Sequence, residues 1–189
     1  MARLILASSS PRRRELLEQL GLVFDIYSPD IDESVQAGES VADYVERLAC
    51  AKAEAVQLQY PDAIVIAADT SLVVDQEILG KPKSKQHAFE MWEKISGRKH
   101  DVYTAVCVRT NTQISSIVVR TEVEFQHLSP NDMEAYWATS EPIGKAGAYA
   151  IQGRGALLVE GIDGCYFNVV GLPLGRVSVL LEGWGVSLE

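Results

Sequence analysis

Hydrophobic positions follow two different spacings in the first half of the chain, which predicts strands separated by helices. The predicted strands are short apolar or alternating runs at residues 4–7, 23–27 and 63–68. The predicted helices carry apolar residues at helical spacing and lie at residues 11–20, 41–59 and 84–95. The run at 63–68 is continuous and rich in β-branched side chains, which is typical of a strand that is buried on both faces.

Serines and prolines mark where several of these helices begin. Ser10, Ser40 and Ser129 each precede an apolar periodic stretch, and serine is a favoured N-cap residue. Pro11 and Pro130 follow two of these serines and suit the first helical position, where a missing N–H costs nothing. These positions predict helix starts at residues 11, 41 and 130.

The second half of the chain is richer in strands. Residues 102–109 and 114–125 are long alternating runs joined by four polar residues, which predicts an antiparallel hairpin. Further along, the pattern predicts a helix at 130–137, two short strands at 157–159 and 166–170 separated by a turn at 161–164, and a last helix at 174–181. This mixture predicts an α/β protein with a mixed central β-sheet and flanking helices, in two lobes around a cleft. With no internal repeat and no linker in the sequence, residues 1–189 are expected to form a single domain.

Composition and charge narrow the function classes. Hydrophobic residues make up 47% and charged residues 23% of the chain, the balance of a soluble globular protein. The net charge of −9 argues against tight non-specific binding to nucleic acid, which three adjacent arginines would otherwise suggest. A small phosphorylated substrate held by a local basic cluster stays open.

The cysteines and the apolar runs point to a cytoplasmic protein. The three cysteines are widely spaced and odd in number, which predicts free thiols in a reducing compartment rather than a disulfide framework or a zinc site. No apolar leader precedes the first arginines, and no uninterrupted apolar run approaches the length of a membrane helix. We therefore expect no membrane association.

The start of the first predicted helix is the strongest local signal. Ser8 and Ser10 precede it, and Arg12 and Arg13 lie in its first turn. A helix N-terminus attracts anions through its unpaired N–H groups and its dipole, whereas cations there are unfavourable unless an anion offsets them. Two interpretations stay open at this point: an anion site, or a capped surface helix with solvated arginines.

Acidic residues and lysines elsewhere could complete a phosphate site. Asp69 and Thr70 follow the buried run at 63–68, and ligands of α/β sheets bind outside the carboxyl ends of strands. Glu33 lies in an acidic stretch, while Lys52 and Lys81 taken singly are typical of solvated lysines. Phosphate chemistry needs cations for the oxygens and one or two carboxylates for Mg²⁺.

The common catalytic fingerprints are absent from the sequence. It contains no GxxxxGK[ST] loop, no GxGxxG after a strand and no GxSxG elbow. His100 and His127 have no spaced partner, so structural roles are expected for both. The set of Arg12, Arg13 and the acids therefore has to be interpreted on its own.

Seven stretches in one order resemble the Maf family of nucleoside triphosphate pyrophosphatases. They are residues 7–13 (ASSSPRR), 33–34 (ES), 67–70 (AADT), 80–82 (GKP), 96–100 (SGRKH), 146–153 (AGAYAIQG) and 168–173 (NVVGLP). The resemblance runs almost from end to end. One departure is Ser9, at a position where relatives carry Gly.

The resemblance implies a Maf-like fold shared with inosine triphosphatase-like enzymes and a hydrolase that acts on acid anhydrides. Such enzymes cleave nucleoside triphosphates to the monophosphate and pyrophosphate with a divalent cation (Mg²⁺, Mn²⁺ or Co²⁺). The late loop at 146–153 resembles the branch that acts on dTTP and UTP, with CTP and modified pyrimidine nucleotides as further candidates. A cytoplasmic homodimer without nucleic-acid or membrane partners is also implied. A non-catalytic nucleotide-binding regulator of septum formation and cell division is the alternative.

The resemblance also implies roles for individual residues. Asp69 matches the catalytic carboxylate that accepts a proton from water, and Glu33 matches a carboxylate needed for metal binding or catalysis. We therefore expect Asp69 and Glu33 as metal ligands. The expected catalytic residues are Asp69, Glu33, Lys52 and Lys81. The expected substrate-binding residues are Ser8, Arg12, Arg13, Thr70 and Gln152, of which Arg12, Thr70 and Gln152 match positions linked to the choice of base.

Overall fold

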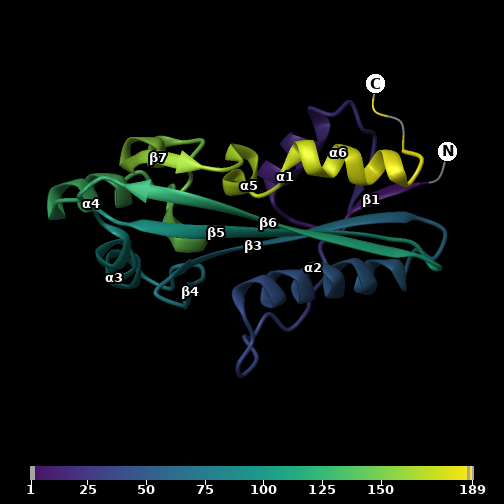
Figure 1. The fold of residues 1–189 in the computed structure, drawn as a ribbon, viewed down its shortest axis with the longest axis horizontal. Helices are drawn as coiled ribbons and strands as arrows, with labels where there is room; N and C mark the ends of the chain where they lie inside the picture. The colour runs from purple at the N-terminus through teal and green to yellow at the C-terminus, as the bar shows by residue number, and fades with distance from the viewer. Residues whose placement is uncertain (1–2, 187, 189) are drawn as a thin grey trace. The chain divides into compact units, whose positions relative to one another are not determined.

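The structure is a computed structural model that describes residues 3–186 and residue 188. Its strands form one mixed sheet in the order β2-β1-β3-β5-β6-β7, with β4 paired to β3 (Figure 1). The strands are β1 (Leu4–Leu6), β2 (Asp25–Ile26), β3 (Ile64–Val74), β4 (Glu77–Leu79), β5 (Lys99–Arg109), β6 (Ile114–Phe125) and β7 (Val159–Asp163). Strand β1 is parallel to β2 and β3, whereas β3–β4 and β6–β7 are antiparallel pairs. The prediction of a mixed α/β sheet with flanking helices is confirmed.

The chain divides into two compact units. The first unit consists of the chain up to Asp69, the stretch Thr104–Val119 and the chain from Gly171 onward. The second unit consists of Thr70–Tyr103 and Arg120–Val170. The helices are α1 (Pro11–Glu18), α2 (Val41–Gln57) and α6 (Leu174–Gly183) in the first unit, and α3 (Lys85–Ile95), α4 (Pro130–Trp137), α5 (Tyr166–Val170) and the 3₁₀ turns η1 (Ala146–Ala148) and η2 (Arg154–Leu158) in the second.

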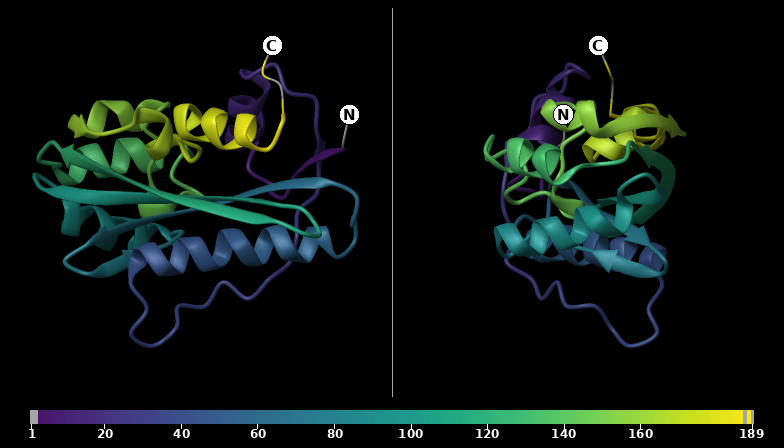
Figure 2. Two further views of the ribbon diagram at one scale, coloured as in Figure 1. Left: turned by 45° about the vertical axis from the view of Figure 1, so that its right-hand side comes forward. Right: turned by 90° about the vertical axis from the view of Figure 1, so that its left-hand side faces the viewer.

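The core of the first unit surrounds β1 and the beginning of β3. All residues of β1 are buried, and so are Val65 to Ala68 of β3. Helix α2 covers one face of these strands, and α1 and α6 cover the other (Figures 1 and 2). The prediction that the run at 63–68 forms a strand buried on both faces is confirmed by β3, and this burial explains why the run is continuously apolar.

The predicted helix caps are confirmed for two of the three serines. Ser40 accepts a hydrogen bond from the N–H of Asp43, and Ser129 forms a complete capping box with Asp132. Ser10 occupies the N-cap position before Pro11, but within the described residues its hydroxyl makes no cap hydrogen bond. The first helix therefore starts where predicted, without the bond that usually fixes such a start.

In the second unit, α3 packs against α4 and η1. His100 lies in a buried aromatic cluster, with its ring centroid 5.0 Å from that of Phe125 and 5.6 Å from that of Tyr149. Its Nε2 is hydrogen-bonded to the Tyr149 hydroxyl at 2.8 Å. The predicted structural role of His100 agrees with this placement.

Two predicted strands in the second half were wrong. Residues 166–170 form helix α5, in which the N–H groups of Asn168 and Val169 bond to the carbonyl of Cys165. The Asn168 side chain is buried and donates to the Val102 carbonyl and to Thr121 Oγ1, both at 3.0 Å. These tertiary contacts override the β-propensity of a Val-rich stretch.

The other prediction misplaced the neighbouring strand. Leu157 and Leu158 belong to η2, and the stretch expected to be a turn is strand β7, paired antiparallel with β6 through Val123 and Ile162. Pairing to a long neighbouring strand supplies the backbone hydrogen bonds that local turn residues do not reveal. Strand β2 is likewise shorter than the predicted 23–27, because it is an edge strand with Val23 almost fully exposed.

Two further predictions concern the cysteines and the membrane. Cys50, Cys107 and Cys165 are free, and Cys107 is buried. Within residues 3–186 and residue 188, no helix combines the length and the apolar character needed to cross a membrane.

Candidate functional site

An ammonium group between two carboxylates forms the centre of the candidate site in the first unit. Lys52 Nζ, on α2, lies 2.6 Å from Asp69 Oδ1 on β3 and 2.7 Å from Glu33 Oε1. The side chains of Lys52 and Asp69 are each 12% exposed, whereas that of Glu33 is 46% exposed. Lys52, which taken singly in the sequence is typical of a solvated lysine, therefore joins the two carboxylates of the cluster.

Asp69 was expected at the end of its strand, and this detail was wrong. Strand β3 continues to Val74, so Asp69 lies within it. Strand β1, however, stops pairing with β3 at Leu6, opposite Ile66. Asp69 thus lies just beyond the carboxyl end of β1, and this is the kind of position where ligands of α/β sheets bind.

The segment that leaves β1 is tied to the start of α1. Ser8 is buried, and its Oγ accepts hydrogen bonds from the Ser10 N–H at 3.2 Å and from Arg13 Nη1 at 3.4 Å. Arg13 Nε donates to the carbonyl of Gly171 at 2.9 Å. The guanidinium of Arg13 is therefore held in place by contacts on two sides.

The charges of the site act on Arg13. Burial lowers the pKa of Arg13, the nearby Asp69 carboxylate raises it, Arg12 lowers it and Glu33 raises it, with a net decrease. Arg13 thus lies within electrostatic range of both carboxylates. A guanidinium that is partly desolvated next to a second guanidinium is favoured by an added anion.

The three adjacent arginines do not share one environment. Arg12 and Arg13 are half-buried, whereas Arg14 is exposed and pairs with Glu18 one turn along the helix at 2.8 Å. The solvated-surface interpretation therefore fits Arg14, whereas for the half-buried Arg12 and Arg13 the anion site stays a prediction.

The donor set fits a hard divalent cation. In the part of the chain that the structure describes, no group of three or more His, Cys, Asp or Glu residues could hold a metal ion. Asp69 and Glu33 nevertheless reach the same Nζ of Lys52, so their oxygens are close together. Mg²⁺ and similar ions keep several waters and need only one or two protein carboxylates, the remaining ligands being water and phosphate oxygens.

Three of the predicted site residues belong to the second unit. Thr70 is half-buried on β3, whereas Lys81 and Gln152 are exposed in irregular segments. The N–H of Gly147 donates to the carbonyl of Gly80 at 3.0 Å, which fixes the segment before Lys81 to the loop that leads to Gln152. Within the second unit, these two segments are thus brought together.

The loop that carries Gln152 is held by a hydrogen-bond network that the sequence did not reveal. The Tyr136 hydroxyl donates to Glu141 Oε1 at 2.7 Å and accepts the N–H of Ala150 at 3.0 Å. The Glu141 carboxylate accepts the N–H groups of Gly155 and Arg154, each at 2.9 Å. These contacts fix the backbone on both sides of the exposed Gln152 side chain.

The same network shifts the titration of Glu141. Burial raises the pKa of Glu141. The hydrogen bonds from the Tyr136 hydroxyl and from the N–H groups of Gly155 and Arg154 together lower it by more, so the net pKa is below the ordinary value. The carboxylate is therefore maintained in its charged, hydrogen-bond-accepting form.

Tyr44 and Arg47 are two further residues that sequence reasoning missed. The Tyr44 hydroxyl donates to the carbonyl of Glu33 at 2.8 Å, and Arg47 contacts the segment that carries Glu33. A signal was available: an acidic stretch precedes α2, whose only cationic residues are Arg47 and Lys52. Both of these cations pair with acids of that stretch.

Comparison with known proteins finds similarity along almost the whole chain. The family model described as Maf-like protein matches residues 3–184. A dTTP/UTP pyrophosphatase of Acinetobacter baylyi is 60% identical over 177 residues, covering 94% of this chain and 97% of that protein. A dTTP/UTP pyrophosphatase of Moorella thermoacetica is 54% identical over 190 residues, covering 100% of this chain and 98% of that protein.

A solved structure supports the fold independently of sequence. The Ham1 protein of Staphylococcus aureus superposes with a TM-score of 0.57 at 15% identity, covering 96% of this chain and 99% of that chain. At this level of identity, the similarity applies to the fold alone, and it agrees with the mixed α/β sheet described above.

Proposed function

The chain belongs to the Maf-like protein family, and we propose that it is a nucleoside triphosphate pyrophosphatase that hydrolyses dTTP and UTP. The products are the nucleoside monophosphate and pyrophosphate. Similarity along the whole chain to dTTP/UTP pyrophosphatases supports this activity. The observation that carries the proposal in this chain is the Glu33–Lys52–Asp69 cluster next to the half-buried Arg13.

Asp69 is the proposed base. Its carboxylate accepts a proton from the water that attacks the α-phosphorus, while the bond from that phosphorus to the bridging oxygen breaks and pyrophosphate leaves. Asp69 and Glu33 would also hold the divalent cation, Mg²⁺, Mn²⁺ or Co²⁺. Such an ion would stabilise negative charge on the phosphate and make the attacking water easier to deprotonate.

Cations of the chain bind the triphosphate. Arg13 presents a planar fork of donors to phosphate oxygens, while Lys52 and Lys81 act as point charges. Ser8 lies next to Arg13 and contributes a hydroxyl. These groups hold the substrate with the α-phosphorus facing the attacking water. Holding the reacting groups in this geometry lowers the barrier to hydrolysis.

The choice of base is assigned to Arg12, Thr70 and Gln152. The amide of Gln152 offers both a donor and an acceptor, which matches the edge of a pyrimidine. A site that pairs these polar groups with the correct base rejects bases that leave them unpaired. The hydrogen-bonded loop around Gln152 supports this assignment, because it fixes the backbone from which the amide projects.

The proposed cellular setting is a cytoplasmic homodimer that removes unwanted nucleotides from the pool. Its partner is the nucleoside triphosphate, and neither nucleic acid nor a membrane is a proposed partner. The net charge of −9 supports the first of these exclusions, because duplex binding requires a basic surface.

The test is pyrophosphate release from a panel of triphosphates in the presence of Mg²⁺ or Mn²⁺. We expect metal-dependent turnover of dTTP and UTP that exceeds turnover of ATP and GTP, and none in EDTA. Binding of dTTP without release of pyrophosphate would contradict the enzyme and favour a nucleotide-binding regulator of cell division. CTP and modified pyrimidine nucleotides in the same panel define the substrate range.

A further inference from the structure

Glu33 lies in a segment that has no regular secondary structure. Residues 28–39 form neither helix nor strand, and the Glu33 side chain is 46% exposed. No ladder of backbone hydrogen bonds therefore fixes the position of this carboxylate. Side chains of α2 that bond to this segment therefore contribute to holding it at 2.7 Å from Lys52 Nζ.

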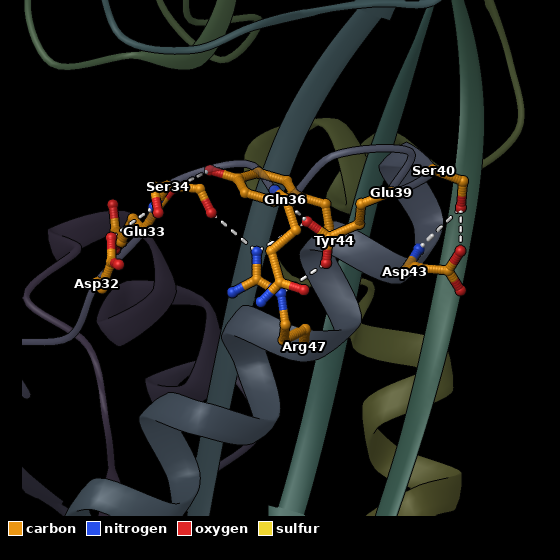
Figure 3. Close-up of polar contacts among 9 residues, drawn as sticks. All are labelled: Asp32, Glu33, Ser34, Gln36, Glu39, Ser40, Asp43, Tyr44 and Arg47. Carbon is orange, nitrogen blue, oxygen red and sulfur yellow. Dashed lines mark hydrogen bonds and ion pairs between the residues drawn. The ribbon is translucent and has the colours of Figure 1, made fainter.

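Arg47 on α2 makes the strongest of these contacts (Figure 3). Its Nε and Nη2 bind the two oxygens of Glu39 at 2.5 and 2.8 Å, and Nη2 also donates to the carbonyl of Ser34 at 3.0 Å. The Glu39 side chain is only 8% exposed and that of Arg47 28%. This bidentate pair, partly shielded from water, fixes both ends of the stretch 34–39 to one guanidinium.

Further contacts fix the backbone around Glu33 itself. The Tyr44 hydroxyl, on α2, donates to the Glu33 carbonyl at 2.8 Å, and the guanidinium of Arg47 lies 5.6 Å from the Tyr44 ring centroid. The N–H of Ser34 donates to Asp32 Oδ1 at 2.9 Å. The peptide group between Glu33 and Ser34 is thus bonded through its carbonyl to Tyr44 on α2 and through its N–H to Asp32 in the loop, and Figure 3 shows these residues beside Arg47.

We propose that Arg47 is a positioning residue of the active site, which holds Glu33 next to Lys52 and Asp69 by binding Glu39 and the carbonyl of Ser34. This inference rests on the proposed function. The Nε and Nη2 of Arg47 are directed to Glu39 and Ser34, so the proposed role of Arg47 is in holding this segment rather than in binding the triphosphate. Arg47 acts by fixing the position of Glu33, whose carboxylate is the more exposed of the two.

The decisive variant is Arg47→Met, with Arg109→Met as matched control. The Arg109 side chain is also 28% exposed and also pairs with one glutamate, Glu54, at 2.9 Å, but among the described residues it forms no hydrogen bond or ion pair with the segment 28–39. For Arg47→Met we expect kcat for dTTP to fall about 10- to 100-fold, because a small displacement of a catalytic group has effects of this size. The KM for dTTP is expected to stay within about twofold, since the phosphate-binding groups remain. Arg109→Met is expected to match the wild type.

A double-mutant cycle with Glu33→Gln separates positioning from general damage. If Arg47 acts through Glu33, Arg47→Met causes no further loss of kcat once Glu33 is Gln. Losses that multiply would overturn the inference. Should Arg47→Met fail to fold, Arg47→Lys takes its place, because it keeps the charge but cannot serve two oxygens of Glu39 and the Ser34 carbonyl together.

A binding measurement provides a readout apart from activity. Electron paramagnetic resonance of Mn²⁺ with an unreactive α,β-methylene analogue of dTTP is expected to show about tenfold weaker Mn²⁺ binding in Arg47→Met and in Glu33→Gln, but not in Arg109→Met. If wild type releases no pyrophosphate, the proposed function fails. If wild type is active and Arg47→Met equals Arg109→Met in both measurements, only the inference about Arg47 fails.

Discussion

Two polar regions of this protein are built on opposite principles. In the first unit, Lys52 binds two carboxylates and Arg13 is half-buried beside a second arginine. In the second unit, the loop around Gln152 is held by one glutamate that accepts a hydroxyl and two N–H groups. The first region consists mainly of charged side chains in ion pairs, whereas in the second region side chains mainly form hydrogen bonds with backbone N–H groups.

This contrast indicates a different role for each region. Ion pairs that are partly removed from water are inefficient stabilisers, because the cost of desolvation offsets the attraction. A cluster of this kind is therefore better explained by a charged ligand than by stability. Satisfied hydrogen bonds and close packing fix one conformation. We expect substitutions in the first region to change activity and those in the second to change stability.

Asp69→Asn should give the largest effect of all. Removing the proposed base is expected to lower kcat for dTTP about 1,000-fold. The free energy of unfolding should change by no more than about 1 kcal/mol, since Asn keeps a hydrogen-bond acceptor for Lys52. Pyrophosphate release and urea denaturation on the same preparation measure both quantities. Full activity in Asp69→Asn would move the proposed base to Glu33.

Gly155→Ala tests the packing of the second region. A Cβ at this position would lie 2.6 Å from the Ala150 carbonyl oxygen and 2.6 Å from the Tyr136 hydroxyl, so backbone must move. We expect the free energy of unfolding to fall by about 3 kcal/mol, as for other overpacked sites. The control is Gly161→Ala, where a Cβ meets nothing within 4 Å. Equal stabilities of the two variants in urea denaturation would contradict the close packing of this loop.

The smallest predicted effect concerns the buried His100. Burial lowers the pKa of His100 to about 3, from 6.5 for an ordinary histidine. Between these two values, the unfolded chain binds a proton that the folded protein does not, so stability falls as the pH falls. At pH 5 this amounts to about 2 kcal/mol relative to pH 7.

The comparison of variants isolates this contribution from other titrating groups. His100→Gln is expected to lose about 2 kcal/mol less stability than wild type between pH 7 and pH 5. Urea denaturation at the two pH values measures the difference. If the two proteins lose stability equally, burial does not suppress protonation of His100 in the folded protein.

Local signals in the sequence predicted much of the fold. Ser40 and Ser129 cap the helices that they were expected to cap, because the cap interaction involves residues only three positions apart. The stretch 166–170 was taken for a strand because its helix depends on tertiary contacts of Asn168. Contacts with residues far away in the chain are not visible in a local pattern.

The candidate site was less predictable from local pattern. The grouping of Glu33, Lys52 and Asp69 joins a loop, a helix and a strand, and only the family resemblance suggested it beforehand. Arg47 and Tyr44 were missed, because their partners on the loop precede the helix and follow no helical spacing. Residues that bind a ligand carry a recognisable chemistry, whereas the only signal for Arg47 was the acidic stretch that precedes its helix.

The contact between Arg13 and the carbonyl of Gly171 has a consequence for the order of folding. The two residues are 158 positions apart, and the first unit takes its last stretch of chain from Gly171 onward. During synthesis the N-terminal arginine emerges first, but its partner emerges only when most of the chain has been made. The proposed anion site at the start of α1 is thus completed late, so a chain released before Gly171 would lack this contact even with every charged residue of the proposed site present.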